Sequence, residues 1–278
     1  PGPPVSAVAA MFCGGVLIDA KPVVTAAHCL DYDENGSVDP VISRQVVVGA
    51  SDLGDLGGPP PVDIESWGEM PDYDPDVGSN DVAVATLASA VDVSSANVKP
   101  AALVAAGEPT PQGTPLVVSG YGQASTNGPV SPLLQAVGVF AVGDPLCEGY
   151  YAASGFNRPT MICAIAPGRD SCYGDSGGPL FDAKGALIGI HSAGSGNTLQ
   201  DGCASDGAIA YAAALSENAP IIEKAFQAVG RMPTRQGQPA PAELGGVCTT
   251  DNTCQSNMCI TVGKERMCSK FCTANGKE

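Results

Sequence analysis

The sequence is poor in basic residues, in aromatic residues and in long apolar runs. Of its 278 residues only 13 are Lys or Arg, against 29 Asp or Glu, so the formal net charge is −16 at pH 7. This charge repels nucleic acid and anionic membranes and excludes both as partners. No apolar run approaches the roughly 18 residues that cross a bilayer. No basic, apolar leader is present either, so we expect a soluble chain whose export signal has been removed or lies outside this sequence.

Glycine and proline are abundant instead, with 35 and 24 copies. This composition suits short strands that are joined by tight turns. Short apolar runs between Gly, Pro and Asp clusters predict an antiparallel barrel architecture, with strands at residues 23–24, 45–48, 82–87, 116–118 and 186–190. A helix is predicted at residues 216–229, where Ser216 supplies an N-cap and apolar residues recur at helical spacing.

The most informative segment surrounds Ser176. Residues 171–179 read Ser-Cys-Tyr-Gly-Asp-Ser-Gly-Gly-Pro, which places this serine in a glycine-rich turn with an acid before it. A serine hydroxyl is a poor nucleophile at neutral pH and needs a base and an oxyanion pocket. His28 lies far upstream in Thr-Ala-Ala-His-Cys, and Asp81 heads the apolar run at 82–87. The chain therefore carries, in this order, a histidine, an acid and a serine that could work together in nucleophilic catalysis.

These three segments resemble the trypsin/chymotrypsin family of serine proteases, and the resemblance covers about the first four-fifths of the chain. It implies an all-β fold of two packed antiparallel β-barrels with a C-terminal helix, plus a small disulfide-rich tail. It also implies that Ser176 is the nucleophile, that His28 is the general base and then the acid, and that Asp81 orients His28. The backbone N–H groups of Gly174 and Ser176 would form the oxyanion hole.

The same resemblance places a specificity pocket around Asp170, six positions before Ser176. A buried carboxylate is costly unless it is paired, so a substrate Arg or Lys is the expected partner. Small residues, Ser192, Gly194 and Gly207, would line the walls and keep the pocket open. The prediction is a secreted serine endopeptidase that cleaves after Arg or Lys, needs no cofactor, and has polypeptide substrates and protein inhibitors as partners.

Eleven cysteines indicate an oxidising compartment, which agrees with secretion. The resemblance implies three disulfides in the main domain: Cys13–Cys29, Cys147–Cys163 and Cys172–Cys203. Residues 1–229 form this predicted domain, and residues 230–242 have the Pro-rich, polar composition of a linker. Residues 243–278 form a Cys-rich module with five cysteines, Cys248, Cys254, Cys259, Cys268 and Cys272. An odd number implies a truncated module, an unpaired thiol or an intermolecular bridge.

The module is similar to short Cys-rich repeats appended to some secreted bacterial proteases, which favours a bacterial source. Two roles for this tail stay open, contact with a surface and protection from proteolysis. The family also buries a new N-terminal amine against the acid before the nucleophile, here Asp175. That amine would belong to a segment upstream of Pro1, so a processed or incomplete piece of a precursor is expected. An inactive protease fold that serves in binding or adhesion, or a zymogen-like form, is the alternative.

A loop at residues 31–39 follows the start of a calcium-binding loop, with oxygen ligands at Asp31, Asp33, Asn35, Ser37 and Asp39. Its closing position holds Ile42 instead of Glu, so an acidic solvated loop is the alternative. The chain has only two histidines, and neither has zinc-site spacing around it. His191 has no motif around it and is predicted to be a packed or hydrogen-bonded residue. By the resemblance, its neighbour Ser192 donates a hydrogen bond to Asp81.

Overall fold

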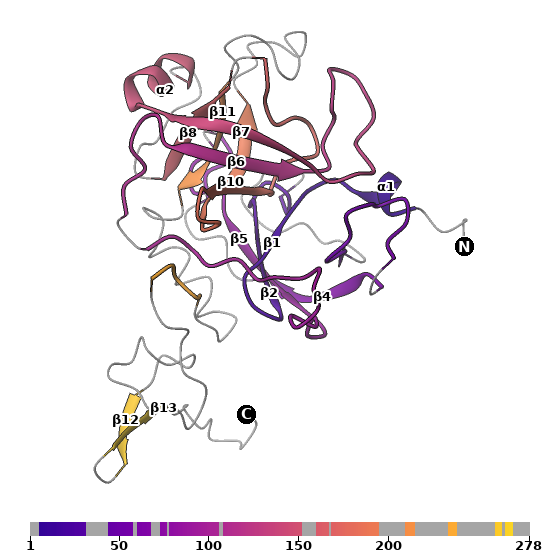
Figure 1. The fold of residues 1–278 in the computed structure, drawn as a ribbon, viewed down its shortest axis with the longest axis vertical. Coiled ribbons are helices and arrows are strands. Elements are labelled where there is room, and N and C mark those ends of the chain that lie inside the picture. Colours follow the sequence, from indigo (N-terminus) through magenta and orange to yellow (C-terminus); the bar gives the residue numbers. More distant parts are fainter. Residues whose placement is uncertain are drawn as a thin grey trace.

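The structure is a computed structural model that describes the backbone of residues 6–31, 44–57, 60–67, 73–76, 78–105, 108–151, 160–166, 168–194, 209–214, 233–237, 259–262 and 265–268. Two antiparallel sheets make up the main body (Figure 1). The helix predicted at residues 216–229 lies outside the described residues, as do Cys203, Gly207, Asp33, Asn35, Ser37 and Asp39. Among the described helices, none is long and apolar enough to span a bilayer.

The first sheet has five strands in the spatial order β1-β2-β5-β4-β3. Their bounds are β1 Val16–Leu17, β2 Pro22–Thr25, β3 Gln45–Val46, β4 Val62–Trp67 and β5 Ala83–Leu87. All four residues of β2 and four of the five in β5 are buried, because these central strands are covered on both faces. Val24 lies opposite both Val16 and Val84, which centres the apolar core of this sheet on β2.

The second sheet closes on itself as a six-stranded barrel in the order β10-β11-β8-β7-β6-β9. Its strands are β6 Pro115–Gly120, β7 Gln135–Val142, β8 Met161–Ile165, β9 Pro179–Asp182, β10 Leu187–Gly194 and β11 Ile209–Ala214. The barrel core contains Leu116, Val139, Ala164, Leu180 and Ile188. Closure leaves no free sheet edge in this half, so every strand is hydrogen-bonded on both sides.

The all-β, two-barrel architecture predicted from the sequence is confirmed, and the predicted runs correspond to β2, β3, β5, β6 and β10. Two helices were not predicted, α1 Ala7–Ala10 and α2 Asp144–Tyr151. The side chain of Ser6 caps α1 by accepting the amide of Ala9. The disulfide between Cys147 and Cys163 ties α2 to β8.

One core cluster joins the two sheets. Val24 and Val84 of the first sheet pack with Leu187 and Ile190 of β10, and Leu103 lies fully buried among them. Strand β10 therefore lies against the first sheet, next to the start of β5. This contact places the C-terminal half of β10 beside Asp81, which precedes β5 directly.

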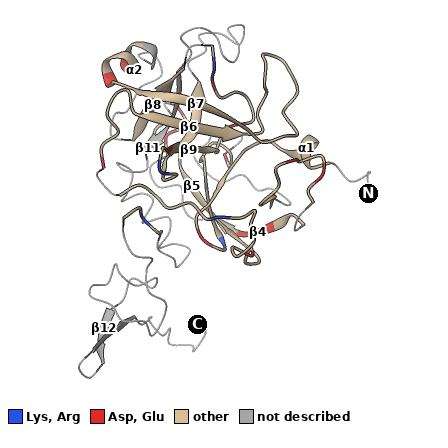
Figure 2. Ribbon diagram, viewed as in Figure 1, with Lys and Arg blue, Asp and Glu red and all other residues tan. Residues whose placement is uncertain are grey.

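Two further pieces follow the barrels. Residues 233–237, inside the predicted linker, run beside Leu103, whose amide donates to the Thr234 carbonyl at 2.8 Å. Strands β12 Cys259–Val262 and β13 Glu265–Cys268 form a hairpin within the predicted Cys-rich module. Cys259 and Cys268 lie opposite each other in that hairpin. Figure 2 shows how sparse Lys and Arg are along the described ribbon.

Candidate active site

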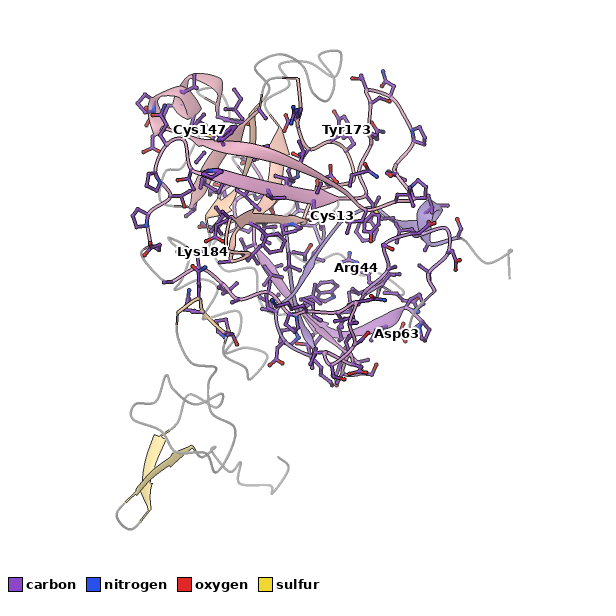
Figure 3. All side chains as sticks on the ribbon, viewed as in Figure 1. Cys13, Arg44, Asp63, Cys147, Tyr173 and Lys184 are labelled. Atoms are coloured by element: carbon purple, nitrogen blue, oxygen red, sulfur yellow. A yellow bond between two sulfur atoms is a disulfide. The ribbon has the colours of Figure 1, made fainter. Side chains whose placement is uncertain are left out.

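His28 lies in a turn that directly follows β2 and is anchored by its neighbour. Cys29 forms a disulfide with Cys13, which lies where the two sheets meet (Figure 3). The side chain of His28 is 31% exposed, so its outer edge is open to solvent. The sulfur of Cys29 lies 3.9 Å from His28 Nε2. A cluster of Cys13, Cys29 and His28 resembles a metal site by proximity alone, but the disulfide leaves no thiolate to bind one.

Asp81 holds His28 at two points. Its Oδ2 lies 2.7 Å from His28 Nδ1, and its Oδ1 accepts the His28 backbone amide at 2.9 Å. Ser192 on β10 donates its hydroxyl to the same Oδ2 at 2.5 Å. Burial by itself would raise the pKa of Asp81, but the bonds from His28 and Ser192 and the charge of His28 outweigh it and lower this pKa. The carboxylate therefore stays ionised and fixes the orientation of the imidazole ring.

Ser176 lies in a turn held by backbone bonds from both sheets. Gly14, just before β1, donates to the Ser176 carbonyl at 2.7 Å, and Gly177 donates to the His191 carbonyl at 2.9 Å. Gly177 has φ +77° and Gly174 has φ +96°, a region that favours glycine. A Cβ at Gly177 would meet the carbonyl of Gly14 at 2.5 Å, so no other residue fits there.

The amides of Gly174 and Ser176 donate to no acceptor in the part of the chain that the structure describes. The turn that presents them is braced by Asp175, whose Oδ1 accepts the Gly122 amide and whose Oδ2 accepts the Cys172 amide, both at 2.8 Å. Burial raises the pKa of Asp175, and these two amides oppose that rise. No cation pairs with Asp175 among the described side chains, and its expected amine partner belongs to no described residue.

Asp170 lies five residues before Asp175, half-buried. Its Oδ1 accepts the Ser171 amide at 2.8 Å and the Ser171 hydroxyl at 3.3 Å. Burial raises the pKa of Asp170 to about 6, against the effect of the Ser171 bonds, and the charge of Asp175 adds to the rise. The described residues offer this carboxylate no salt bridge. An incoming cation would relieve the cost of its ionisation.

Hydrogen bonds thus bring His28, Asp81 and Ser192 together, and backbone bonds place the Ser176 turn beside β10. Gly194 is exposed at the end of β10. Two expected disulfides are present, Cys13–Cys29 and Cys147–Cys163. Cys172 also forms a disulfide, and its partner is not among the described residues. Of the calcium-loop residues only Asp31 is described, and it is buried.

Sequence reasoning missed two supports of this site. Thr25, buried at the end of β2, donates its hydroxyl to the Gly14 carbonyl at 2.8 Å and so steadies the segment that bonds to Ser176. Gly122 carries the amide that binds Asp175. The signal for Gly122 was a Gly-Tyr-Gly run at the end of an apolar strand, and Thr25 had no signal beyond its place three residues before His28.

Comparisons with known proteins bear on the family and the fold. The family model described as Trypsin matches residues 5–222. Trypsin alpha-4 of Lucilia cuprina is 36% identical over 185 residues, which cover 66% of this chain and 68% of that protein. Hypodermin-B of Hypoderma lineatum is 37% identical over 190 residues, which cover 66% of this chain and 68% of that protein. These relatives come from insects and lend no support to a bacterial source.

A solved structure is similar over most of its length. Neuropsin, a serine protease expressed in the limbic system of mouse brain, superimposes with a TM-score of 0.63 and is 26% identical. The superposition covers 77% of this chain and 88% of the neuropsin chain.

Proposed function

The chain belongs to the trypsin family of serine proteases and is a serine endopeptidase, and from that premise we propose that it is secreted and cleaves polypeptides after Arg or Lys. The proposal assigns catalysis to His28, Asp81 and Ser176. Support for secretion comes from the disulfides, which persist in oxidising compartments. The trypsin names of several relatives support the specificity.

In the proposed mechanism, Ser176 Oγ attacks the substrate carbonyl carbon while His28 Nε2 takes its proton. Asp81 accepts the Nδ1 hydrogen of His28, which leaves Nε2 as the basic atom and stabilises the imidazolium that forms. The amides of Gly174 and Ser176 donate to the oxyanion of the tetrahedral intermediate. Loss of one such donor typically costs about 2.7–4 kcal/mol of transition-state stabilisation.

The second half of the reaction reverses these roles. His28 Nε2–H protonates the leaving amine as the peptide C–N bond breaks, and an ester between Ser176 and the acyl group remains. Water then loses a proton to His28 Nε2 and attacks this ester, which restores the Ser176 hydroxyl and releases the acid product. Partial exposure of the His28 side chain supports this sequence, because the leaving amine and the water must both reach Nε2.

The specificity rests on one observation, the half-buried carboxylate of Asp170, which has no cation partner among the described groups and whose pKa is raised to about 6. A substrate Arg or Lys would supply the missing charge. The acidity of the whole chain adds a long-range attraction for such substrates. Ser192, Gly194 and Gly207 are the proposed walls of the pocket, and Cys172–Cys203 the disulfide beside it.

Reporter peptides with Arg, Lys, Phe or Ala before the scissile bond test this proposal. We expect kcat/KM for Arg and Lys to exceed that for Phe by at least 100-fold. Replacing Asp170→Ser should remove this preference while a fluorophosphonate still labels Ser176. A wild-type preference for Phe would contradict the specificity, and absence of labelling would contradict the catalytic assignment and favour a binding role.

Two finer points belong to the same proposal. Protein inhibitors that block trypsin-like enzymes are expected partners, and the Cys-rich tail is proposed as a surface contact. Calcium binding at residues 31–39 stays a hypothesis. Only one of the five expected ligands, Asp31, is described, and that residue is buried. A rise in melting temperature on adding calcium, lost in Asp33→Ala, tests it.

A further inference from the structure

His191 on β10 is a buried polar side chain that the proposed mechanism does not use. The residue is only 7% exposed. Neither Nδ1 nor Nε2 of its ring has a hydrogen-bond partner among the described groups. Buried polar atoms are almost always paired, so an imidazole with two empty nitrogens calls for an explanation.

The backbone of His191 fastens the turn that carries the nucleophile. Its amide donates to the Gly178 carbonyl at 2.8 Å, and its carbonyl accepts the Gly177 amide at 2.9 Å. Both partners follow Ser176 directly. The next residue, Ser192, donates its hydroxyl to Asp81. Two consecutive residues of β10 therefore connect the serine turn to the acid that orients His28.

The charged groups that bear on the His191 ring are His28 and Asp81. The pKa of His191 is lowered to about 4, first by burial and then by the charge of His28, while the charge of Asp81 opposes the shift. Both oxygens of Asp81 already accept hydrogen bonds from other groups: Oδ1 from the His28 amide, and Oδ2 from His28 Nδ1 and Ser192.

The other described elements around the ring bring no counter-charge. On β9, Pro179 and Leu180 are uncharged, and on β11 Ala212 lies opposite His191 while Tyr211, the one titratable residue of that strand, lies opposite Ala193. The serine segment carries two acids, but Asp170 is bound by Ser171 and Asp175 by the amides of Gly122 and Cys172.

We propose that His191 is a positioning residue that holds the serine turn in place only while its buried ring is neutral, so that proton uptake by this ring in acid releases the turn and disables the site. A charged imidazolium needs hydrogen-bond acceptors, and no described residue offers one to either ring nitrogen. The ring gains both only if β10 moves away from the turn, which breaks the backbone bonds of Gly177 and Gly178. The inference rests on the proposed roles of His28 and Ser176.

This device has a kinetic signature that a purely structural residue lacks. Protonation of His28 alone gives a log rate that falls with slope 1 as the pH decreases. Proton uptake by His191 adds a second proton below about pH 4. The slope should therefore approach 2, and at pH 3 the wild-type rate should lie about tenfold below the slope-1 line, because one pH unit below a pKa is a tenfold effect.

The test measures the rate at which a fluorophosphonate labels Ser176 between pH 3 and pH 8, which is independent of the preference for Arg or Lys. His191→Val replaces the ring by a β-branched side chain that suits a strand. His191→Gln replaces it by a polar amide that does not titrate. Both should be labelled at pH 7.5 within about threefold of wild type and keep slope 1 down to pH 3. The exposed acid variant Asp92→Asn serves as the control and should retain the wild-type slope.

Hydrogen exchange provides a second readout. In the wild type, protection of the Gly177 amide should fall at least tenfold between pH 6 and pH 3.5, after correction for intrinsic exchange, and both His191 variants should keep it. Equal acid slopes in wild type and both variants would overturn the role of His191, as would folded variants that are unlabelled at pH 7.5. A wild-type chain that is not labelled at pH 7.5 would instead overturn the catalytic assignment itself.

Discussion

The carboxylate of Asp175 accepts the backbone amide of Gly122 at 2.8 Å, across 53 positions of sequence. This bond joins the loop after β6 to the turn that presents Ser176. A second amide, that of Cys172, binds the other oxygen of the same carboxylate. The orientation of the peptide groups at Gly174 and Ser176 therefore depends on a carboxylate seated between two loops, and the close approach of Gly122 is what admits it.

The first prediction concerns Gly122→Ala. A Cβ at this position would lie 2.5 Å from Asp175 Cγ, so the carboxylate must move and the oxyanion amides must move with it. We expect kcat/KM to fall at least 100-fold, in line with loss of an oxyanion donor. The control is Gly138→Ala on β7, where no heavy atom lies within 4 Å of the added Cβ. Steady-state kinetics with an Arg peptide measure both, and equal activity of the two variants would refute the idea.

The second prediction concerns the bond from Ser192 to Asp81. Ser192→Ala removes one of the hydrogen bonds that lower the pKa of Asp81, so this pKa should rise. A hydrogen bond to a charged group contributes about 1.5–3 kcal/mol, which corresponds to a loss of roughly 10- to 100-fold in kcat/KM. Ser192→Thr keeps a hydroxyl and should retain most of the activity. A Ser192→Ala variant with wild-type kcat/KM would show that this bond is dispensable.

The third prediction is a pH dependence set by Asp170, whose folded pKa of about 6 lies above the ordinary value of 3.8. Arg substrates need the ionised form, so the ratio of kcat/KM for an Arg peptide to that for an Ala peptide should fall about tenfold from pH 7 to pH 5. Taking the ratio cancels the titration of His28. A ratio that stays constant over this range would place the Asp170 pKa outside it.

The same shift has a consequence for stability with a definite sign. Because the folded state disfavours the ionised form of Asp170, this residue destabilises the fold above about pH 6. That destabilisation disappears as the pH falls from about 6 towards 3.8, the ordinary pKa of an aspartate side chain. Asp170→Asn should therefore raise the melting temperature at pH 7.5, leave it unchanged at pH 4, and abolish the preference for Arg. A lower melting temperature at pH 7.5 would contradict the assigned sign.

The sequence was sufficient to predict those features that depend on residues close together in the chain. The segments around His28, Asp81 and Ser176 combine side chains and glycines that favour nucleophilic catalysis, and the structure confirms contact between His28 and Asp81. The central strands β2 and β5 were also predictable, because residues buried on both faces form unbroken apolar runs. Strand β7 was harder, since Gly138 interrupts its alternation and half of its residues are exposed.

What escaped prediction depends on contacts between distant segments. The amide of Gly122 binds Asp175 through a backbone atom, which leaves no trace in side-chain chemistry. His191 was interpreted as a packed or hydrogen-bonded residue; the structure shows it packed, with neither ring nitrogen bonded within the described residues. Residues 233–237 have the composition of a linker, yet composition does not reveal that a buried site beside Leu103 is available to them.

The last prediction follows from that docked segment. Arg235 is only 6% exposed, its Nη1 donates to the Val104 carbonyl at 3.0 Å, and the flanking Gln236 amide donates to Leu103. Arg235→Ala would leave a buried carbonyl without this donor, at a cost of about 1–3 kcal/mol. For a domain of this size each kcal/mol lowers the melting temperature by about 2–4 °C, so a decrease of several degrees is expected.

Activity at 25 °C should be unaffected by Arg235→Ala, because the segment touches neither His28 nor Ser176. The exposed Lys184→Ala on the turn before β10 is the matched control and should melt like the wild type. A chain that ends after residue 237 should melt several degrees above one that ends after residue 229, since only the longer chain keeps the contacts to Leu103 and Val104. Equal melting of these two truncations would show that residues 233–237 behave as a free linker and contribute nothing to the stability of the protease body.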